Sequence, residues 1–259
     1  MKSSYTALAA GAVICALSGS LHAAAGLLIV EKTMAGAGPA RTNQIQIESN
    51  RLRAESTGPR GEKQVVIFDG ARQVLLMIDD GNKTYTEMTK ADAEMLGAQM
   101  ADAMAQIKKQ LAGLPPEQRA KIEGMMTGRG SGAKPQYRRA GTETVGKWTC
   151  DKYERYDGDQ KTGEVCTVDP KALGLTAADF AVSGQFVEFF KKVVPQMADQ
   201  AFAIGTMEQQ GFAGVPVKRT VTVAGSQITT EIADVSKQTF PDASYTVPAG
   251  YQKKPFGAR

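Results

Sequence analysis

Histidine is almost absent from this sequence of 259 residues, which contains only His22. Because His22 lies in an N-terminal segment that we expect to be removed, the mature chain would have no histidine. Catalysis by Ser-His-Asp or Cys-His groups and zinc sites with histidine ligands are therefore not expected. No pattern of an activated nucleophile is visible, so we expect no enzyme, no catalytic residue, no metal and no cofactor; carboxylate, serine, lysine or tyrosine chemistry is the enzymatic alternative.

Long hydrophobic runs are also scarce. Lys2 and the apolar run from Ala7 to Leu17 precede small residues at Ala23 and Ala25, which predicts a secretory signal peptide over residues 1–23. No later run reaches membrane length, and the segment 180–204 carries several charges, so we expect no membrane span. Residues 24–259 are expected to form a single domain that is periplasmic or secreted after cleavage.

Cysteine is nearly as scarce, with three residues in the chain. Cys15 falls in the predicted signal peptide, which leaves Cys150 and Cys166 for an oxidising compartment, where an even pair favours a disulfide. The two are almost equidistant from a predicted turn at Gly158, so we expect them to face each other across neighbouring strands. A redox-active pair is the alternative, although the CxxC spacing is missing.

Charge is nearly balanced, with 31 Lys and Arg against 27 Asp and Glu. The two signs are interspersed along the chain, which is typical of a solvated surface. We therefore expect no nucleic-acid partner.

Alternating polar and apolar residues dominate the sequence from Leu27 to Met88 and predict a meander of strands. Asp69-Gly70 and Asp80-Gly81 are expected to form its hairpin turns, because Asp-Gly pairs tolerate positive backbone angles. Further strands are predicted over 136–145, 148–156, 161–168, 215–223 and 227–235.

Two helical insertions, near 89–126 and 177–204, interrupt the strands. Thr89 and Asp92 form a capping-box pattern at the start of a helix that we expect to reach about Leu111. A shorter helix follows Pro115, and the later insertion is expected to kink near Pro195. Strands joined by hairpins, with helices to cover one face, predict an α+β fold with an antiparallel sheet.

Three passages resemble a known family: VVIFDGARQVLLMIDDGNKTYTEM at 65–88, WTCDKYERYDGDQKTGEVCTVD at 148–169 and FPDASYTVPAGYQKK at 240–254. They resemble a family of exported bacterial domains of unknown function related to the periplasmic lipoprotein carriers of the LolA and LolB type. The resemblance implies an incomplete antiparallel β-barrel, a curved sheet with helices packed into its concave face. It provides no residue that can be carried over as a lipoprotein-binding position.

We therefore expect a soluble binding or carrier protein for an apolar ligand such as a lipid, an acyl chain or a lipoprotein. Methionine-rich helical faces can repack around ligands of different shape, although such a stripe is also typical of an ordinary core. The alternative is an envelope protein-interaction or signalling module with a filled core and no ligand. The residues expected on the ligand-binding apolar face are Leu96, Met100, Met104, Ile107, Phe186 and Phe190.

Aromatic and basic residues gather in the strands on either side of the cysteines. Such a strip can bind polysaccharide or lipid headgroups, or it can be half-buried sheet with a solvated outer face. Its members are Tyr137, Arg138, Arg139, Trp148, Tyr153, Arg155 and Tyr156.

Overall fold

A computed structural model describes residues 25–58, 61–119, 122, 135–193, 211–223 and 225–257. The predicted signal peptide, most of the short helix after Pro115 and the expected kink near Pro195 lie outside these ranges. They stay predictions.

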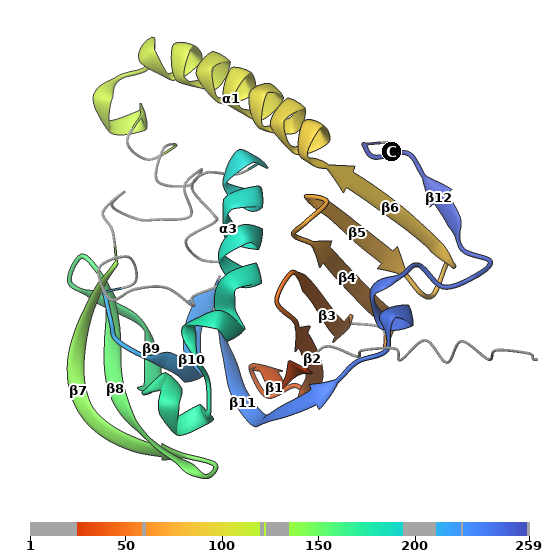
Figure 1. Cartoon of the computed structure of the whole chain (residues 1–259). Helices are drawn as coiled ribbons and strands as arrows, with labels where there is room; N and C mark the ends of the chain where they lie inside the picture. The colour runs from red at the N-terminus through yellow and green to blue at the C-terminus, as the bar shows by residue number, and fades with distance from the viewer. Residues whose placement is uncertain are drawn as a thin grey trace, which may run out of the picture.

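Twelve strands form a single curved sheet that does not close on itself (Figure 1). Its order is β12-β6-β5-β4-β3-β2-β1-β11-β10-β9-β8-β7. Eleven of the strands pair with their neighbours in antiparallel orientation, as the alternation in the sequence predicts. The strands are β1 (Ala25–Ala35), β2 (Arg41–Ile47), β3 (Arg51–Thr57), β4 (Lys63–Asp69), β5 (Val74–Asp79), β6 (Thr84–Thr89), β7 (Gln136–Val145), β8 (Trp148–Asp157), β9 (Gln160–Val168), β10 (Val215–Val223), β11 (Ser226–Thr239) and β12 (Gln252–Lys254).

The described helices are few. α1 spans Lys90–Ala112 and α3 spans Ala181–Val193. Three single turns of 3₁₀-helix, η1 (Pro170–Leu173), η2 (Ala177–Phe180) and η3 (Asp242–Tyr245), link the larger elements. In Figure 1, α3 stands on the concave side of the sheet and α1 continues outward from the end of β6.

The predicted fold class, α+β with an incomplete antiparallel sheet and a helix on its concave face, is confirmed. Two details differ from the prediction. The last strand, β12, pairs with β6 in parallel, from Gln252 opposite Thr84 to Lys254 opposite Thr86. Within the described residues of the two predicted helical covers, α3 packs onto the concave face, whereas α1 contacts α3 and the end of β6 and reaches the core with Ala93 and Leu96.

The hairpin turns after β4 and β5 differ from the predicted Asp-Gly mechanism. The positive φ angles fall on Gln73 (54°) and Lys83 (51°), the last residues of the two turns, and not on the glycines. Asp69 and Asp79 instead close each turn by accepting the backbone N–H of the residue three positions on, at 2.9 and 3.0 Å. The side chains of the aspartates therefore stabilise the turns.

Phenylalanines fix α3 to the concave face of the sheet. The ring of Phe68 on β4 lies 5.2 Å from that of Phe186 and 5.4 Å from that of Phe189, in edge-on and tilted arrangements that aromatic pairs favour. Phe186 is 2% exposed, and Phe68 and Phe189 are fully buried. Leu27, Leu52 and Leu75 extend the same cluster along the neighbouring strands.

The convex face of the same strands has a second core, built by the C-terminal segment. Phe240 and Tyr245 pack against Val65, Ile67 and Ile78, which alternate with the residues of the concave core. Burial on both faces explains why β4 contains a continuous apolar run instead of a strict alternation.

Arg51 ties this C-terminal segment to the sheet. Its guanidinium lies 2.6 Å from a carboxylate oxygen of Glu48, 2.7 Å from one of Asp242 and 4.4 Å from the centre of the Tyr245 ring. A planar guanidinium can satisfy two carboxylates and an aromatic face at once, so one side chain joins β3 to the chain end.

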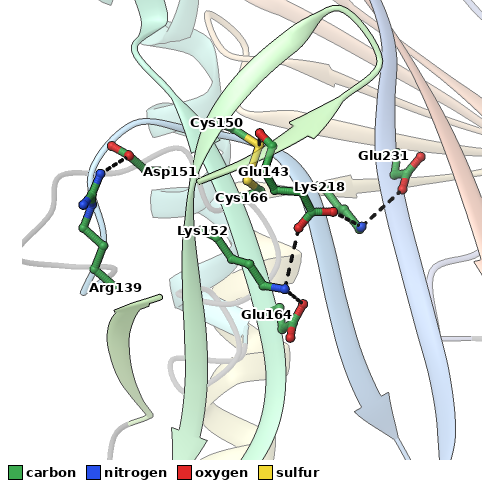
Figure 2. Close-up of a disulfide and its surroundings, with 9 residues drawn as sticks. All are labelled: Arg139, Glu143, Cys150, Asp151, Lys152, Glu164, Cys166, Lys218 and Glu231. Atoms are coloured by element: carbon green, nitrogen blue, oxygen red, sulfur yellow. Dashed lines mark hydrogen bonds and ion pairs between the residues drawn. A yellow bond between two sulfur atoms is a disulfide. The ribbon is translucent and has the colours of Figure 1, made fainter. Parts of the chain in front are cut away.

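Cys150 and Cys166 form the predicted disulfide, with a Cα–Cα distance of 5.4 Å (Figure 2). They lie on the neighbouring strands β8 and β9, as expected, but they do not face each other directly. A bulge between Arg155 and Tyr156 shifts the register, so that Lys152 is opposite Cys166 and the disulfide joins diagonal positions.

Replacement of both cysteines by serine should lower the free energy of unfolding by roughly 2 to 4 kcal/mol, because the cross-link restricts the unfolded chain. Urea unfolding followed by circular dichroism measures this difference, and protein purified from the periplasm should show no free thiol after denaturation. Two thiols that react freely with an alkylating reagent would contradict the disulfide.

Candidate functional site

The first turn of α1 is fixed by the predicted capping box. The Thr89 hydroxyl accepts the backbone N–H of Asp92 at 3.2 Å, and the Asp92 carboxylate accepts the backbone N–H of Thr89 at 2.8 Å. Both bonds satisfy donors that a helix start would otherwise leave unpaired. The helix direction is therefore set where the chain leaves β6.

One turn later, α1 crosses the C-terminal end of α3 at Gly97. A Cβ atom at this position would overlap the backbone carbonyl oxygen of Lys192, so only glycine permits this approach. Next to the crossing, the ammonium of Lys192 lies 3.0 Å from the Glu94 carboxylate. The two helices thus meet backbone to backbone at a defined point.

Beyond the crossing, the face of α1 that meets α3 continues as an apolar stripe. Leu96 is half-buried and packs against the main core. Met104 and Ile107 are half-buried, and Met100 is 40% exposed. Four of the predicted ligand-binding residues therefore share one helix face, and burial decreases from Leu96 to Met100.

The two phenylalanines predicted for the same surface lie on α3. Their rings are 4.7 Å apart in an edge-on arrangement. Phe186 is a core residue, while Phe190 is half-buried and packs at the margin of the core. Phe190 is thus the member of the pair that adjoins the surface.

Sequence reasoning missed a pair of charged residues on the concave face, Glu31 of β1 and Arg219 of β10. Burial raises the pKa of the Glu31 carboxyl, and the nearby Arg219 guanidinium opposes part of that rise. Burial lowers the pKa of Arg219, against the attraction of Tyr137 and Glu31. In sequence, both residues are ordinary members of alternating strands, so only the pairing of distant strands could reveal them.

A row of ion pairs crosses β7, β8, β9 and β10 on the face opposite Arg219 (Figure 2). Lys152 lies 2.8 Å from Glu164 and 3.7 Å from Glu143, and Lys218 lies 2.6 Å from Glu143. Glu164 and Lys218 border a shallow polar groove that also includes Thr220. Because these charges are already paired with one another, the groove is a structural feature of the sheet.

The aromatic and basic strip predicted from the sequence is divided between environments. Tyr137 and Tyr153 pack against the buried ring of Phe212, at 4.9 and 6.2 Å between ring centres. Arg138 instead lies 4.4 Å above the ring of Tyr156. The strip is therefore not one continuous surface.

Among the described residues, no group of three or more His, Cys, Asp or Glu side chains is arranged to hold a metal ion. Within the same ranges, no helix is long and apolar enough to cross a membrane.

The fold and these surfaces define an open antiparallel half-barrel with one helix in its concavity. Residues 133–251 match the family model of DUF4412, a domain of unknown function. The match begins just before β7 and ends before β12, and so includes the disulfide, α3, and Phe240 and Tyr245 of the C-terminal segment. A comparison with characterised proteins finds no match.

Solved structures with a similar arrangement include an uncharacterised conserved protein from Thermus thermophilus, with 6% identity, a TM-score of 0.43 and coverage of 90% of this chain and 91% of that one. A LolA superfamily protein from Nitrosomonas europaea has 9% identity, a TM-score of 0.29 and coverage of 87% and 91%. The Pseudomonas aeruginosa MucA/MucB complex has 10% identity, a TM-score of 0.39 and coverage of 88% and 57%.

The family match agrees with the resemblance stated from the sequence over residues 133–251. Because every TM-score is below 0.5, the functional argument that follows rests on the residues of this chain.

Two helical glycines form a matched test of the crossing between α1 and α3. Gly184→Ala, in α3, adds a methyl group into open space and should stabilise the protein by roughly 0.5 to 1 kcal/mol. Gly97→Ala gains the same helix propensity but forces the helices apart, and should destabilise by roughly 1 to 3 kcal/mol. Thermal and urea unfolding compare the two, and equal effects would contradict the tight crossing.

Glu31→Gln should stabilise the protein at neutral pH. The folded-state pKa of Glu31 is raised, so the ionised carboxyl opposes folding above that pKa, and this cost disappears as the pH falls through it. The gain should therefore vanish below about pH 4, where the carboxyl is protonated in both states. Urea unfolding at neutral pH and below about pH 4 measures this gain in the free energy of unfolding.

Glu94→Gln is the control with the opposite sign, because a hydrogen bond from Lys192 lowers the pKa of Glu94. It should bring no gain at neutral pH. A loss of stability in Glu31→Gln at pH 7 would show that Glu31 is a stabilising ion.

Proposed function

We propose that this protein is a non-enzymatic periplasmic binding protein for an apolar ligand, held against the apolar stripe of α1 where it passes the end of α3. The stripe is formed by Leu96, Met100, Met104 and Ile107, with Phe190 beside it. The ligand class is a lipid, an acyl chain or the lipid-bearing part of a protein.

The observation that carries the proposal is the partial exposure of this stripe. Met100 remains 40% exposed although it lies on the helix face that begins by packing against α3. Met100 continues into half-buried Met104 and Ile107, and the flexible thioethers of the two methionines can adapt to varied apolar shapes. Such a surface is suited to a ligand with mixed acyl chains.

The disulfide supports the proposed compartment. Bonds such as Cys150–Cys166 form and persist in oxidising surroundings, which in bacteria means outside the cytoplasm. Together with the predicted signal peptide, this favours export to the periplasm.

A protein-interaction module is the second candidate, and a specific observation favours it. The concavity above β3, β4 and β5 is filled by Phe186 and Phe189 of α3, so this part of the half-barrel is packed with protein. In such a module, the stripe on α1 would contact an apolar surface of an envelope protein, and no lipid would co-purify.

Native mass spectrometry of protein purified from the periplasm separates the two candidates. The carrier proposal expects a co-purifying lipid and binding of a fluorescent fatty acid by the delipidated protein. Absence of both would favour the interaction module.

Two exposed methionines of α1 provide a matched pair of variants. Met100→Glu places a charge on the stripe and should weaken fatty-acid binding at least about tenfold, because a carboxylate opposes contact with an acyl chain. Met95, which is 52% exposed, lies on a different face of the helix, so Met95→Glu should leave the affinity unchanged. Equal affinities in the two variants would contradict the placement of the site.

A further inference from the structure

Arg219 stands in a row of residues that crosses five strands on one face of the sheet. It is opposite Val165 of β9 and Thr230 of β11. Thr230 is opposite Thr33 of β1, and Val165 is opposite Tyr153 of β8. Because directly opposed residues of antiparallel strands point to the same face, all five side chains lie on one side of the sheet.

This side is the concave one. Leu27 and Ile29 of β1 belong to the main core with α3, and Glu31 and Thr33 follow them at intervals of two residues. The pairing of β1 with β2 is regular from Leu27 to Thr33, so no bulge interrupts the alternation. Arg219 and Glu31 therefore share the face that α3 covers further along the sheet.

The guanidinium of Arg219 is left without a direct partner. It is half-buried, and no hydrogen bond or ion pair joins it to another residue in the described ranges. Glu31, the nearest acid on this face, likewise makes no ion pair within those ranges. Because the side chain is only half-buried, its guanidinium keeps contact with water, and an anion supplied from outside the chain can reach it.

A second guanidinium faces the same region. Arg155 of β8 is opposite Gly163 of β9, and Gly163 is opposite Val221 of β10. The glycine between them has no side chain on this face. Arg155 binds Asp157 at 3.2 Å through one terminal nitrogen, but its buried Nε atom has no hydrogen-bond partner.

The pKa shifts of Arg219 and Glu31 agree with an excess of positive charge at this place. The pKa of Arg219 is lowered, chiefly by burial and in part by Arg155, and the pKa of Glu31 is raised by burial. Glu31 is thus shifted toward its neutral form and offsets the arginines less than a solvated carboxylate would.

We propose that Arg219, assisted by Arg155, binds the carboxylate headgroup of a fatty acid or similar amphiphile on the concave face. The planar fork of a guanidinium matches the two oxygens of a carboxylate. Half-buried Val221 and Ile228, which oppose each other in the adjoining row of the same face, offer apolar contact for the start of the chain. This inference rests on the proposed function, because it takes the same class of ligand and gives it a second contact on the concave face, separate from the stripe of α1.

Isothermal titration calorimetry of the delipidated mature protein with sodium laurate and with dodecanol tests it, because the two compounds share a chain and differ in charge. The parent protein should bind laurate more tightly than dodecanol. Arg219→Gln should weaken laurate binding at least about tenfold, the worth of a charged hydrogen bond, and leave dodecanol binding unchanged. Arg219→Lys should restore part of the difference.

Arg72→Gln is the control, since Arg72 is an exposed arginine in the turn between β4 and β5. It should bind both compounds as the parent does. Arg219→Met provides a second uncharged variant should the glutamine variant fold poorly, and circular dichroism checks both.

Unchanged laurate binding in Arg219→Gln and Arg219→Met would overturn this inference while leaving the proposed function intact, as would equal binding of laurate and dodecanol by the parent. Binding of neither compound by the parent would overturn the proposed function and the inference with it.

Discussion

The contact of Phe186 and Phe189 with Phe68 determines which part of the concave face is covered by protein. A curved sheet with a free concave face would expose a large apolar surface, and these three rings close the part of it over β3 to β5. A ligand of the proposed class would thereby be confined to places that α3 does not cover. Two such places are present among the described residues: the stripe of α1 beyond Gly97, and the concave face around Arg219.

The convex face is covered by other parts of the chain. The C-terminal segment builds its own core on the back of β4 and β5, and Arg51 and the bond from the Tyr251 hydroxyl to Asp80 fasten that segment to the sheet. On β8, β9 and β10, the face opposite Arg219 instead carries paired lysines and glutamates. Arg219 and Arg155, by contrast, lie on the concave side.

Local signals in the sequence predicted the local structure well. Thr89 and Asp92 mark the start of α1, the alternation predicts the strands, and the two cysteines predict their bond, because each signal depends on neighbours along the chain. Features that depend on the pairing of strands distant in the sequence could not be predicted. The bulge in β9 that places Cys166 opposite Lys152, on the same face as Cys150, leaves no trace in composition, and Arg219 and Glu31 are brought to one face only by the order β1-β11-β10. The stripe on α1 was visible as a periodicity, but a periodicity does not say how much of a helix face is covered.

The central claim is that an apolar ligand binds outside the core, on the stripe of α1. Methionine methyl groups report this directly, because Met100 is exposed on the stripe whereas Met88 of β6 is buried in the main core. NMR spectra of protein labelled at the methionine methyl groups would be recorded during titration with laurate. The account predicts that the Met100 and Met104 signals shift in a saturable manner while the Met88 signal stays in place. A shift of Met88 without Met100 and Met104, or no shift in any of the three, would contradict it.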